Sequence, residues 1–152
     1  MGPEIKTILL AIAPINELRG TIPIALAFFH FSPLKALLLA YIGNMIPVFL
    51  LLLFWKRLAW ILTRRFKLFD RFFFWLFERT RKRIYNKYKV WGDIALVCFV
   101  AIPLPITGAW IGTVAAFLLG VPYWKAVGLI FLGVIISGII VTLASLGISS
   151  LI

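Results

Sequence analysis

The sequence predicts an all-α integral membrane protein whose single membrane domain contains two inverted repeats. Each repeat is expected to hold a re-entrant helical hairpin and one transmembrane helix, and a cytoplasmic amphipathic basic helix joins the repeats. The 152 residues are 63% hydrophobic and 14% charged, with a mean hydropathy of +1.07, which is too apolar for a soluble domain of this size. In addition, the positive charge is concentrated in one central segment, and the same broken apolar pattern precedes and follows that segment.

The formal net charge of +11 comes from 16 Lys and Arg against 5 Asp and Glu, and 12 of the basic residues lie between residues 56 and 89. Because short loops rich in Lys and Arg stay in the cytoplasm, the connector at residues 56–92 is expected to lie there. Its apolar residues follow helical spacing, which is typical of an amphipathic helix on the membrane surface. The residues expected to bind anionic lipid headgroups are Arg79, Arg81, Lys82 and Arg83. The alternative is that these charges only fix the topology and solvate the connector.

Two apolar segments are long enough to cross a bilayer. Residues 34–55 contain no acidic residue and would extend about 33 Å as a helix, against a hydrocarbon core of about 30 Å. Pro47 is expected to bend this helix, and basic residues follow its cytoplasmic end. Residues 124–151 form the second predicted span, in which several glycines favour close contact between helices.

Two other apolar segments, residues 4–31 and 94–119, are interrupted near their middle by polar residues or prolines. Each arm has about ten apolar residues and would be about 15 Å long as a helix, which is half the depth of a bilayer. In the second break, Pro103 and Pro105 remove hydrogen-bond donors and disfavour a continuous helix. A re-entrant hairpin is therefore predicted in both places. The alternative is a proline-kinked helix that crosses the membrane directly.

The two halves of the chain share their spacing, which indicates an internal repeat. Two prolines nineteen residues apart bracket each hairpin, Pro14 and Pro33 in the first half and Pro103 and Pro122 in the second. Lys35 and Gly43 of the first long helix correspond to Lys125 and Gly133 of the second. We assign the first repeat to residues 4–55 and the second to residues 93–152.

The predicted topology makes the repeats antiparallel. A hairpin returns to its own side of the membrane and the next helix crosses once, so the second hairpin enters from the face opposite to the first. With the basic connector in the cytoplasm, both termini lie outside. The two hairpin tips are then expected to meet near the bilayer midplane, where transporters built from inverted repeats hold their substrate.

The tip of the first hairpin carries two charged residues, Glu17 and Arg19, at the predicted depth of the bilayer centre. Burying either charge costs a few kcal/mol even on the gentlest insertion scales, and intramembrane charges of this kind are usually functional. We expect Arg19 to bind an anionic head group and Glu17 to carry a proton that couples the cycle. The alternative is that the two residues form an ion pair that staples the turn.

The second arm of each hairpin is predicted to start beside the tip, at Gly20 in the first hairpin and at Thr107 in the second. Two helix N-termini would then direct unpaired N–H groups at one place, and such ends attract anions. Polar side chains there cap or coordinate, glycines admit the ligand closely, and an indole packs on a lipid chain. The predicted substrate-binding residues are Arg19, Asn16, Gly20, Thr21, Thr107, Gly108 and Trp110. The alternative is that they only terminate and pack short helices.

Enzymatic and metal chemistry find little support in the sequence. The single histidine, His30, is expected at the interface, and the single cysteine, Cys98, is expected to be a buried, inert thiol. No His and Cys cluster is available to hold a metal ion, and we expect neither a cofactor nor an enzymatic activity. Nucleic-acid binding is not expected, because a basic helix tethered between membrane segments has a closer polyanion in the lipid.

Two strings of residues resemble the small multidrug export family, which is similar to the DedA superfamily of membrane proteins. They are Pro14-Ile15-Asn16-Glu17-Leu18-Arg19-Gly20-Thr21-Ile22-Pro23 and Pro103-Leu104-Pro105-Ile106-Thr107-Gly108-Ala109-Trp110-Ile111-Gly112-Thr113. The resemblance implies paired re-entrant hairpins and, for DedA relatives, proton-linked movement of polyprenyl-phosphate carrier lipids or related phospholipids. It also implies that Glu17 takes the place of an essential acid in the first hairpin. DedA proteins carry arginines in the second half, whereas the comparable cation here is Arg19 in the first.

We therefore predict a transporter of the DedA type that moves an anionic amphiphile, first of all a polyprenyl-phosphate carrier lipid or a phospholipid, across the cytoplasmic (inner) membrane. Protons and membrane lipids are the expected partners. A second copy of the chain is also expected, because isolated hairpins would leave backbone groups unpaired in lipid. One alternative is a proton-coupled exporter of small molecules, including drugs. Another is a membrane-organising protein without transport activity, whose basic helix recruits anionic lipid.

Overall fold

The protein is all-helical in the part of the chain that the computed structural model describes, which is residues 2–65, 71–72, 74–75, 78, 89–103 and 108–149. This confirms the predicted helical class. The helices in these residues are α1 (Pro3–Ile12), α2 (Glu17–Ala27), α3 (Pro33–Arg65), α5 (Lys89–Ala101), α6 (Ala109–Leu118) and α7 (Tyr123–Ser149). The predicted lipid-binding residues of the connector, Arg79, Arg81, Lys82 and Arg83, lie outside the described residues, and so does Thr107.

Two of these helices, α3 and α7, are long and apolar enough to cross a membrane by length and composition. Within α3 the apolar stretch covers Pro33–Ile61, with Pro47 inside the helix. The helix continues past the predicted end at residue 55, because no glycine or proline interrupts residues 56–65. The basic residues that begin the connector therefore extend the same helix.

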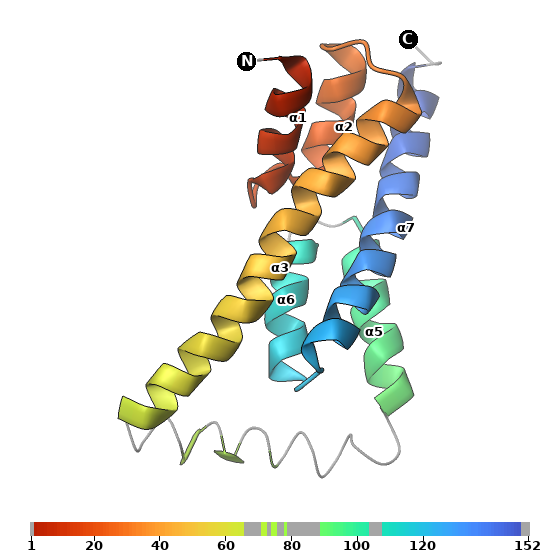
Figure 1. Ribbon diagram of the computed structural model, residues 1–152. Coiled ribbons are helices and arrows are strands. Elements are labelled where there is room, and N and C mark those ends of the chain that lie inside the picture. The colour runs from red at the N-terminus through yellow and green to blue at the C-terminus, as the bar shows by residue number, and fades with distance from the viewer. Residues whose placement is uncertain are drawn as a thin grey trace.

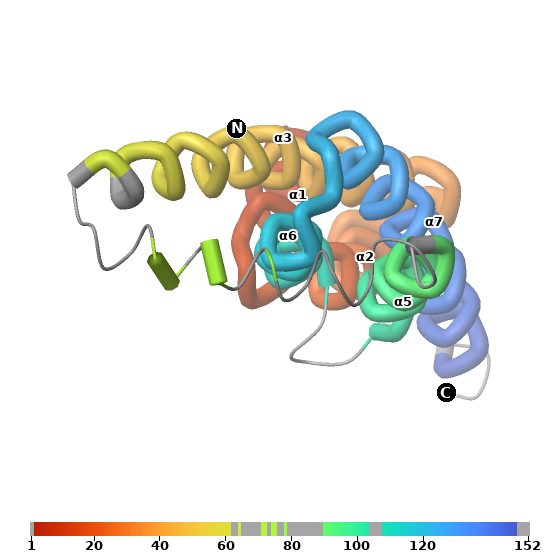
Figure 2. The backbone as a smooth tube through the Cα atoms, turned by 90° about the horizontal axis from the view of Figure 1, so that it is seen from below, coloured from red at the N-terminus to blue at the C-terminus, as the bar shows by residue number. Residues whose placement is uncertain are grey.

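The four short helices form two hairpins. Figure 1 shows α1 and α2 running in opposite directions in the upper half of the molecule, and α5 and α6 doing the same in the lower half. The start of α1 and the end of α7 lie at the top, whereas the end of α3 and the start of α5 lie at the bottom. The view from below in Figure 2 places α6 beneath the first hairpin. The tips of the two hairpins therefore face each other near the middle of the molecule.

Each hairpin packs its first helix against the long helix that follows it, and a glycine makes the close approach possible. A methyl group at Gly43 would lie 2.5 Å from the carbonyl oxygen of Ile8 and 2.7 Å from the Cβ of Ala11. In the second half, a methyl group at Gly133 would lie 2.7 Å from the Cβ of Val100. Small residues at such positions let helix backbones pack closely in lipid.

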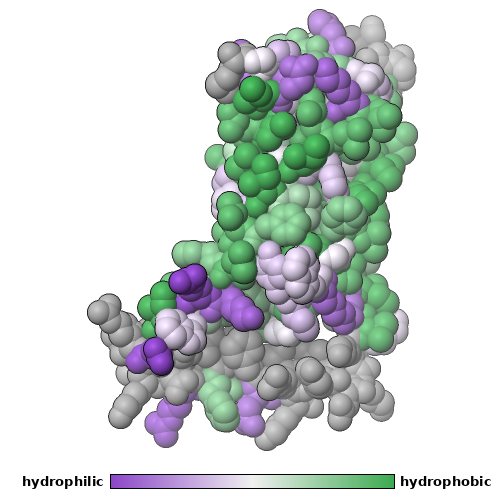
Figure 3. All heavy atoms as spheres, in the orientation of Figure 1, coloured by the Kyte–Doolittle hydropathy of each residue, from purple (hydrophilic) through white to green (hydrophobic). Residues whose placement is uncertain are grey.

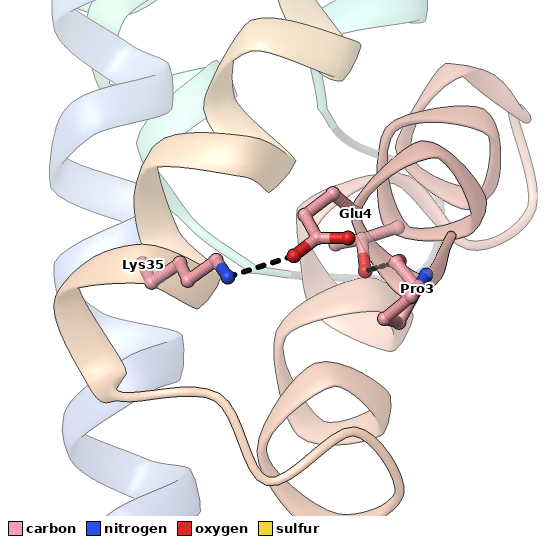
Figure 4. Close-up of polar contacts among 4 residues, drawn as sticks. Pro3, Glu4 and Lys35 are labelled. Atoms are coloured by element: carbon pink, nitrogen blue, oxygen red, sulfur yellow. Dashed lines mark hydrogen bonds and ion pairs between the residues drawn. The ribbon is translucent and has the colours of Figure 1, made fainter.

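The outer end of each of these helix pairs carries an ion pair. Lys35 of α3 donates a hydrogen bond to the Glu4 carboxylate of α1 at 2.9 Å, as Figure 4 shows. In the second half, Lys125 of α7 pairs with Asp93 of α5. Both pairs join the start of a hairpin to the start of the long helix that follows it.

The molecular surface is apolar over most of its height. Figure 3 shows hydrophobic side chains covering the middle of the visible face, with hydrophilic groups gathered toward the upper and lower ends. Leu50 of α3 and Leu143 of α7 are 63% and 65% exposed. A protein in water does not leave so much contiguous apolar surface uncovered, so this distribution suits a lipid environment.

Candidate functional site

The candidate site lies where the two hairpin tips meet. The ends of three short helices come together there, namely the C-termini of α1 and α5 and the N-terminus of α6. Each of these ends has backbone groups without intrahelical partners. In each case the partner is supplied by a side chain from the opposite hairpin, so the two tips complete each other.

Glu17 provides the partner for the N-terminus of α6. Its carboxylate Oε1 accepts a hydrogen bond from the backbone N–H of Trp110 at 3.3 Å, and the residue is only 6% exposed. The helix has no side-chain cap of its own. A carboxylate at a helix N-terminus is stabilised by the unpaired N–H groups and by the helix dipole. The carboxylate at the tip of the first hairpin therefore caps a helix of the second hairpin.

The backbone at this contact has unusual conformations on both sides. Glu17 has φ 40°, in the left-handed region that is uncommon for residues other than glycine. Gly108, which precedes α6, has φ 121° and ψ −174°, a conformation essentially restricted to glycine. A methyl group at Gly108 would overlap the Glu17 carboxylate. Gly108 thus makes the room that the Glu17 carboxylate occupies, and its predicted contact with a ligand stays a prediction.

Arg19 provides the partner for the C-terminal end of α5. Its Nη2 lies 3.5 Å from the carbonyl oxygen of Ile102, the residue that follows this helix. A cation near a helix C-terminus is stabilised by the unpaired carbonyl groups. The two charged residues of the first hairpin therefore contact opposite kinds of helix end on the second hairpin.

Trp110 completes the contact in the reverse direction. Its indole Nε1 donates a hydrogen bond to the carbonyl oxygen of Ile12, the last residue of α1, at 3.2 Å. The indole thereby closes the end of α1, because an indole N–H at this depth needs an acceptor. The packing of its ring on a lipid chain stays a prediction.

Two residues of this region, Thr113 and Trp55, were not singled out as site residues from the sequence. Thr113 is fully buried, donates a hydrogen bond to the carbonyl oxygen of Trp110 at 2.7 Å, and accepts one from the indole of Trp55 at 3.2 Å. The available signal was that a hydroxyl on an apolar helix in lipid must find a partner. The identity of that partner, 58 residues away on α3, could not be deduced from spacing.

The start of the second arm in the first hairpin was predicted wrongly. α2 begins at Glu17 and not at Gly20, because Glu17, Leu18 and Arg19 are good helix formers and an acid is favourable in a first turn. Gly20 and Thr21 therefore lie inside α2 and cannot present a helix N-terminus. Gly20 faces Asn16 of its own first turn, which makes no side-chain cap.

Among the described residues, three buried side-chain oxygen atoms have no hydrogen-bond partner. They are Thr21 Oγ1 on α2, and Tyr41 Oη and Asn44 Oδ1 on α3. Within the described ranges, no group of three or more His, Cys, Asp or Glu could hold a metal ion. Cys98 is exposed on α5, so the expectation of a buried thiol was wrong; an apolar thiol is tolerated on a helix face that meets lipid.

Comparison with known proteins gives a family for this chain. Residues 17–140 match the model of the family described as "Putative small multi-drug export protein". The matched range includes Glu17, Arg19, all of α3, the whole second hairpin and α7 as far as residue 140. No curated protein and no solved structure matches the chain. With most of its length covered by this one model, the chain belongs to the small multi-drug export protein family.

Proposed function

We propose that this membrane protein is a proton-coupled transporter of the DedA type, which moves an anionic amphiphile across the cytoplasmic membrane. A polyprenyl-phosphate carrier lipid or a phospholipid is the proposed cargo. Membership of an export family supports transport as the activity. The observation that favours an anionic cargo is the Glu17 carboxylate on the backbone N–H of Trp110, with Arg19 on the same hairpin tip. A site that holds one anion by amide groups beside a guanidinium is suited to another, such as a phosphate.

The proposed architecture is a pair of inverted repeats, and matched contacts in the two halves support it. Val97 and Val100, which approach Gly133, stand 89 residues after Ile8 and Ala11, which approach Gly43. The ion pairs have the same relation, because Asp93 and Lys125 follow Glu4 and Lys35 by 89 and 90 residues. Two hairpins that enter from opposite faces would make the tips accessible from either side in turn.

In the proposed mechanism the charged Glu17 and the cargo use the same partners. The carboxylate holds the first amide groups of α6 while the site is empty of cargo. A proton on Glu17 neutralises the carboxylate and weakens its hold on these groups, since a charged acceptor makes the stronger hydrogen bond. The anionic head group of the cargo then binds the amide groups of α6 and Arg19. When the cargo leaves on the other side of the membrane, Glu17 releases its proton there and its carboxylate again accepts the N–H of Trp110.

The proposal extends to the surroundings of the site. The basic connector would lie in the cytoplasm and bind anionic headgroups through Arg79, Arg81, Lys82 and Arg83. A homodimer would cover the lipid-facing sides of the short hairpins. Crosslinking in membranes, followed by mass measurement of the crosslinked species, tests the dimer independently of transport.

Reconstitution in liposomes tests the proposed activity. The purified chain should move a fluorescent polyprenyl phosphate between leaflets, measured as loss of fluorescence on adding a membrane-impermeant quencher. Glu17→Gln and Arg19→Ala should each lower the rate by at least about tenfold, the effect of one lost charge-assisted hydrogen bond of about 1.5 kcal/mol. Glu4→Gln and Lys6→Ala are the matched controls, because they remove the same charges from α1 away from the tips. Rates that survive both tip variants would overturn the proposal.

A second candidate is a proton-coupled exporter of small molecules, which the family description favours. The same proteoliposomes separate the two, since an exporter would move a small amphiphilic dye against a pH gradient and leave the labelled lipid in place. Arg19 beside the carboxylate argues against cationic drugs, because a guanidinium at the hairpin tip repels them. If neither cargo moves and only vesicles with anionic lipid bind the connector, the membrane-organising function would be favoured instead.

A further inference from the structure

We propose that Trp55 and Thr113 are positioning residues that fix the first turn of α6 against Glu17. This inference rests on the proposed proton-carrying role of Glu17. It adds that the cytoplasmic half of α3, where Trp55 lies, controls how firmly that carboxylate is held. The hydrogen bonds of both residues lead to the carboxylate through Trp110.

A continuous chain of hydrogen bonds links Trp55 to Glu17. The Trp55 indole Nε1 donates to Thr113 Oγ1 at 3.2 Å, and that hydroxyl donates to the carbonyl oxygen of Trp110 at 2.7 Å. The backbone N–H of Trp110 then donates to Glu17 Oε1 at 3.3 Å. The chain therefore begins on α3, crosses the first turn of α6 and ends on α2.

The geometry at Thr113 explains why this chain is rigid. The residue is 0% exposed, and its hydroxyl both donates and accepts, so its rotamer is fixed by two partners. The Trp55 ring also stacks on Phe117, one turn further along α6, with centroids 6.4 Å apart and an interplanar angle of 30°. Trp55 thus contacts one side of α6 through both a hydrogen bond and a stacked ring.

The arrangement goes beyond what packing alone requires. A threonine inside a helix can satisfy its hydroxyl on a preceding carbonyl, as Thr113 does with Trp110, and needs no second partner. A tryptophan near the end of a membrane helix usually places its N–H at the polar interface. Trp55 instead directs its N–H inward at a buried hydroxyl. A change in the tilt of α3 would therefore move the first turn of α6 and alter the hold on Glu17.

Carbodiimide labelling gives a direct readout that needs no cargo. A hydrophobic carbodiimide modifies buried carboxyl groups only when they are protonated, and mass spectrometry of the full-length protein in liposomes quantifies modification at Glu17. Trp55→Phe keeps the ring and removes the N–H, and Thr113→Val keeps the shape and removes the hydroxyl. Each should raise the initial labelling rate at neutral pH about fivefold, the effect of losing one hydrogen bond of about 1 kcal/mol.

The controls distinguish positioning from general destabilisation. Thr113→Ser restores the hydroxyl and should return the rate to that of the unaltered protein, which a purely structural role of the methyl group would not allow. Trp124→Phe makes the same change at a tryptophan that is 78% exposed and should leave the rate unchanged. Labelling rates in Trp55→Phe and Thr113→Val that equal the unaltered rate would overturn the inference.

Amide hydrogen exchange provides a second measurement that does not depend on the proton role of Glu17. The amides in the first turn of α6 should exchange about fivefold faster in Trp55→Phe and Thr113→Val, whereas amides in α1 should keep their rates. Unchanged exchange in the first turn of α6 would overturn the inference. If amide exchange in the two variants is faster as expected but Glu17 never reacts with carbodiimide, the proposed proton role of Glu17 has failed and the positioning of α6 stands.

Discussion

The carboxylate of Glu17 accepts the backbone N–H of Trp110 at 3.3 Å, and this hydrogen bond joins the two hairpin tips together with those from Arg19 and from the Trp110 indole. The charge belongs to the first hairpin and the helix end belongs to the second. Arg19 repeats the relationship with the opposite sign at Ile102. The two halves of the chain are therefore chemically unequal at their point of contact, because the first supplies two charged side chains, whereas the second supplies backbone groups and the neutral indole of Trp110.

Gly108→Ala is expected to displace the Glu17 carboxylate. A methyl group there would overlap the carboxylate, and φ 121° is strained for any residue with a side chain. Such strain costs about 1–3 kcal/mol, so the free energy of unfolding in detergent should fall by about 2 kcal/mol. Carbodiimide labelling of Glu17 should rise at the same time.

The matched control for this variant is Gly128→Ala. That glycine lies in α7 with no atom within 4 Å of an added methyl group. Alanine is favoured over glycine inside a helix by about 0.5–1 kcal/mol, so this change should stabilise the protein slightly and leave labelling unaltered. Equal stability of the two variants would show that Gly108 has no special role.

Gly43→Ala and Gly133→Ala are expected to have similar effects, because the two glycines make the same kind of contact in the two halves. The added methyl groups would lie 2.5 Å from the Ile8 carbonyl oxygen and 2.7 Å from the Val100 Cβ. Overpacking of this kind costs about 1–3 kcal/mol. Unfolding by a denaturing detergent measures the free energy of unfolding of both variants, which should fall by this amount.

The control for this pair is Gly147→Ala, since a methyl group at that position also meets nothing within 4 Å. Its free energy of unfolding should stay within about 0.5 kcal/mol of the unaltered protein. A loss of stability in Gly43→Ala without one in Gly133→Ala would mean that the two hairpins do not pack in equivalent ways. That result would weaken the inverted-repeat proposal.

Trp110→Phe removes the indole N–H and leaves the carbonyl oxygen of Ile12 without this donor. An unsatisfied buried acceptor costs about 1–3 kcal/mol, which should appear as a loss of stability and as faster amide exchange at the C-terminal end of α1. Trp124→Phe, at an exposed position, should change neither. Unchanged exchange in α1 would show that the indole does not hold this helix end.

Much of the fold follows from local patterns in the sequence. The breaks near Asn16 and Pro103 predict the turns of both hairpins, and the long apolar runs predict α3 and α7. The start of α2 was misplaced because Asn16 and Gly20 resemble a loop, whereas the residues between them favour a helix. Local composition identifies helices well but gives their ends only to within a few residues.

The candidate site was predictable in its residues but not in their partners. Glu17 and Arg19 stand out because charges are costly at the centre of a membrane. That each would hold a helix end of the other hairpin depends on how the two tips dock, which no sequence spacing encodes. The hydrogen bond from Trp55 to Thr113 was missed for the same reason, because it joins residues on α3 and α6.

The ion pair between Glu4 and Lys35 at the start of α1 should make the stability of the protein depend on pH. The hydrogen bond from Lys35 lowers the pKa of Glu4 below its ordinary value of 4.5. A carboxyl whose pKa is lowered by folding adds stability above its unfolded pKa, and this stability is lost as the pH falls through the folded pKa. The melting temperature should therefore fall between about pH 5 and pH 3, near the ordinary range of Glu.

Lys35→Met should remove most of this part of the pH dependence, because the hydrogen bond from Lys35 is the largest cause of the lowered pKa of Glu4. Lys6→Met takes the same charge from an exposed position on α1 and should leave the pH dependence in place. Since both partners are exposed, about 1 M salt should also screen the effect. If Lys35→Met keeps the full acid dependence of the unaltered protein, that dependence comes from another carboxyl group and the pair at the outer end of α1 and α3 contributes nothing to it.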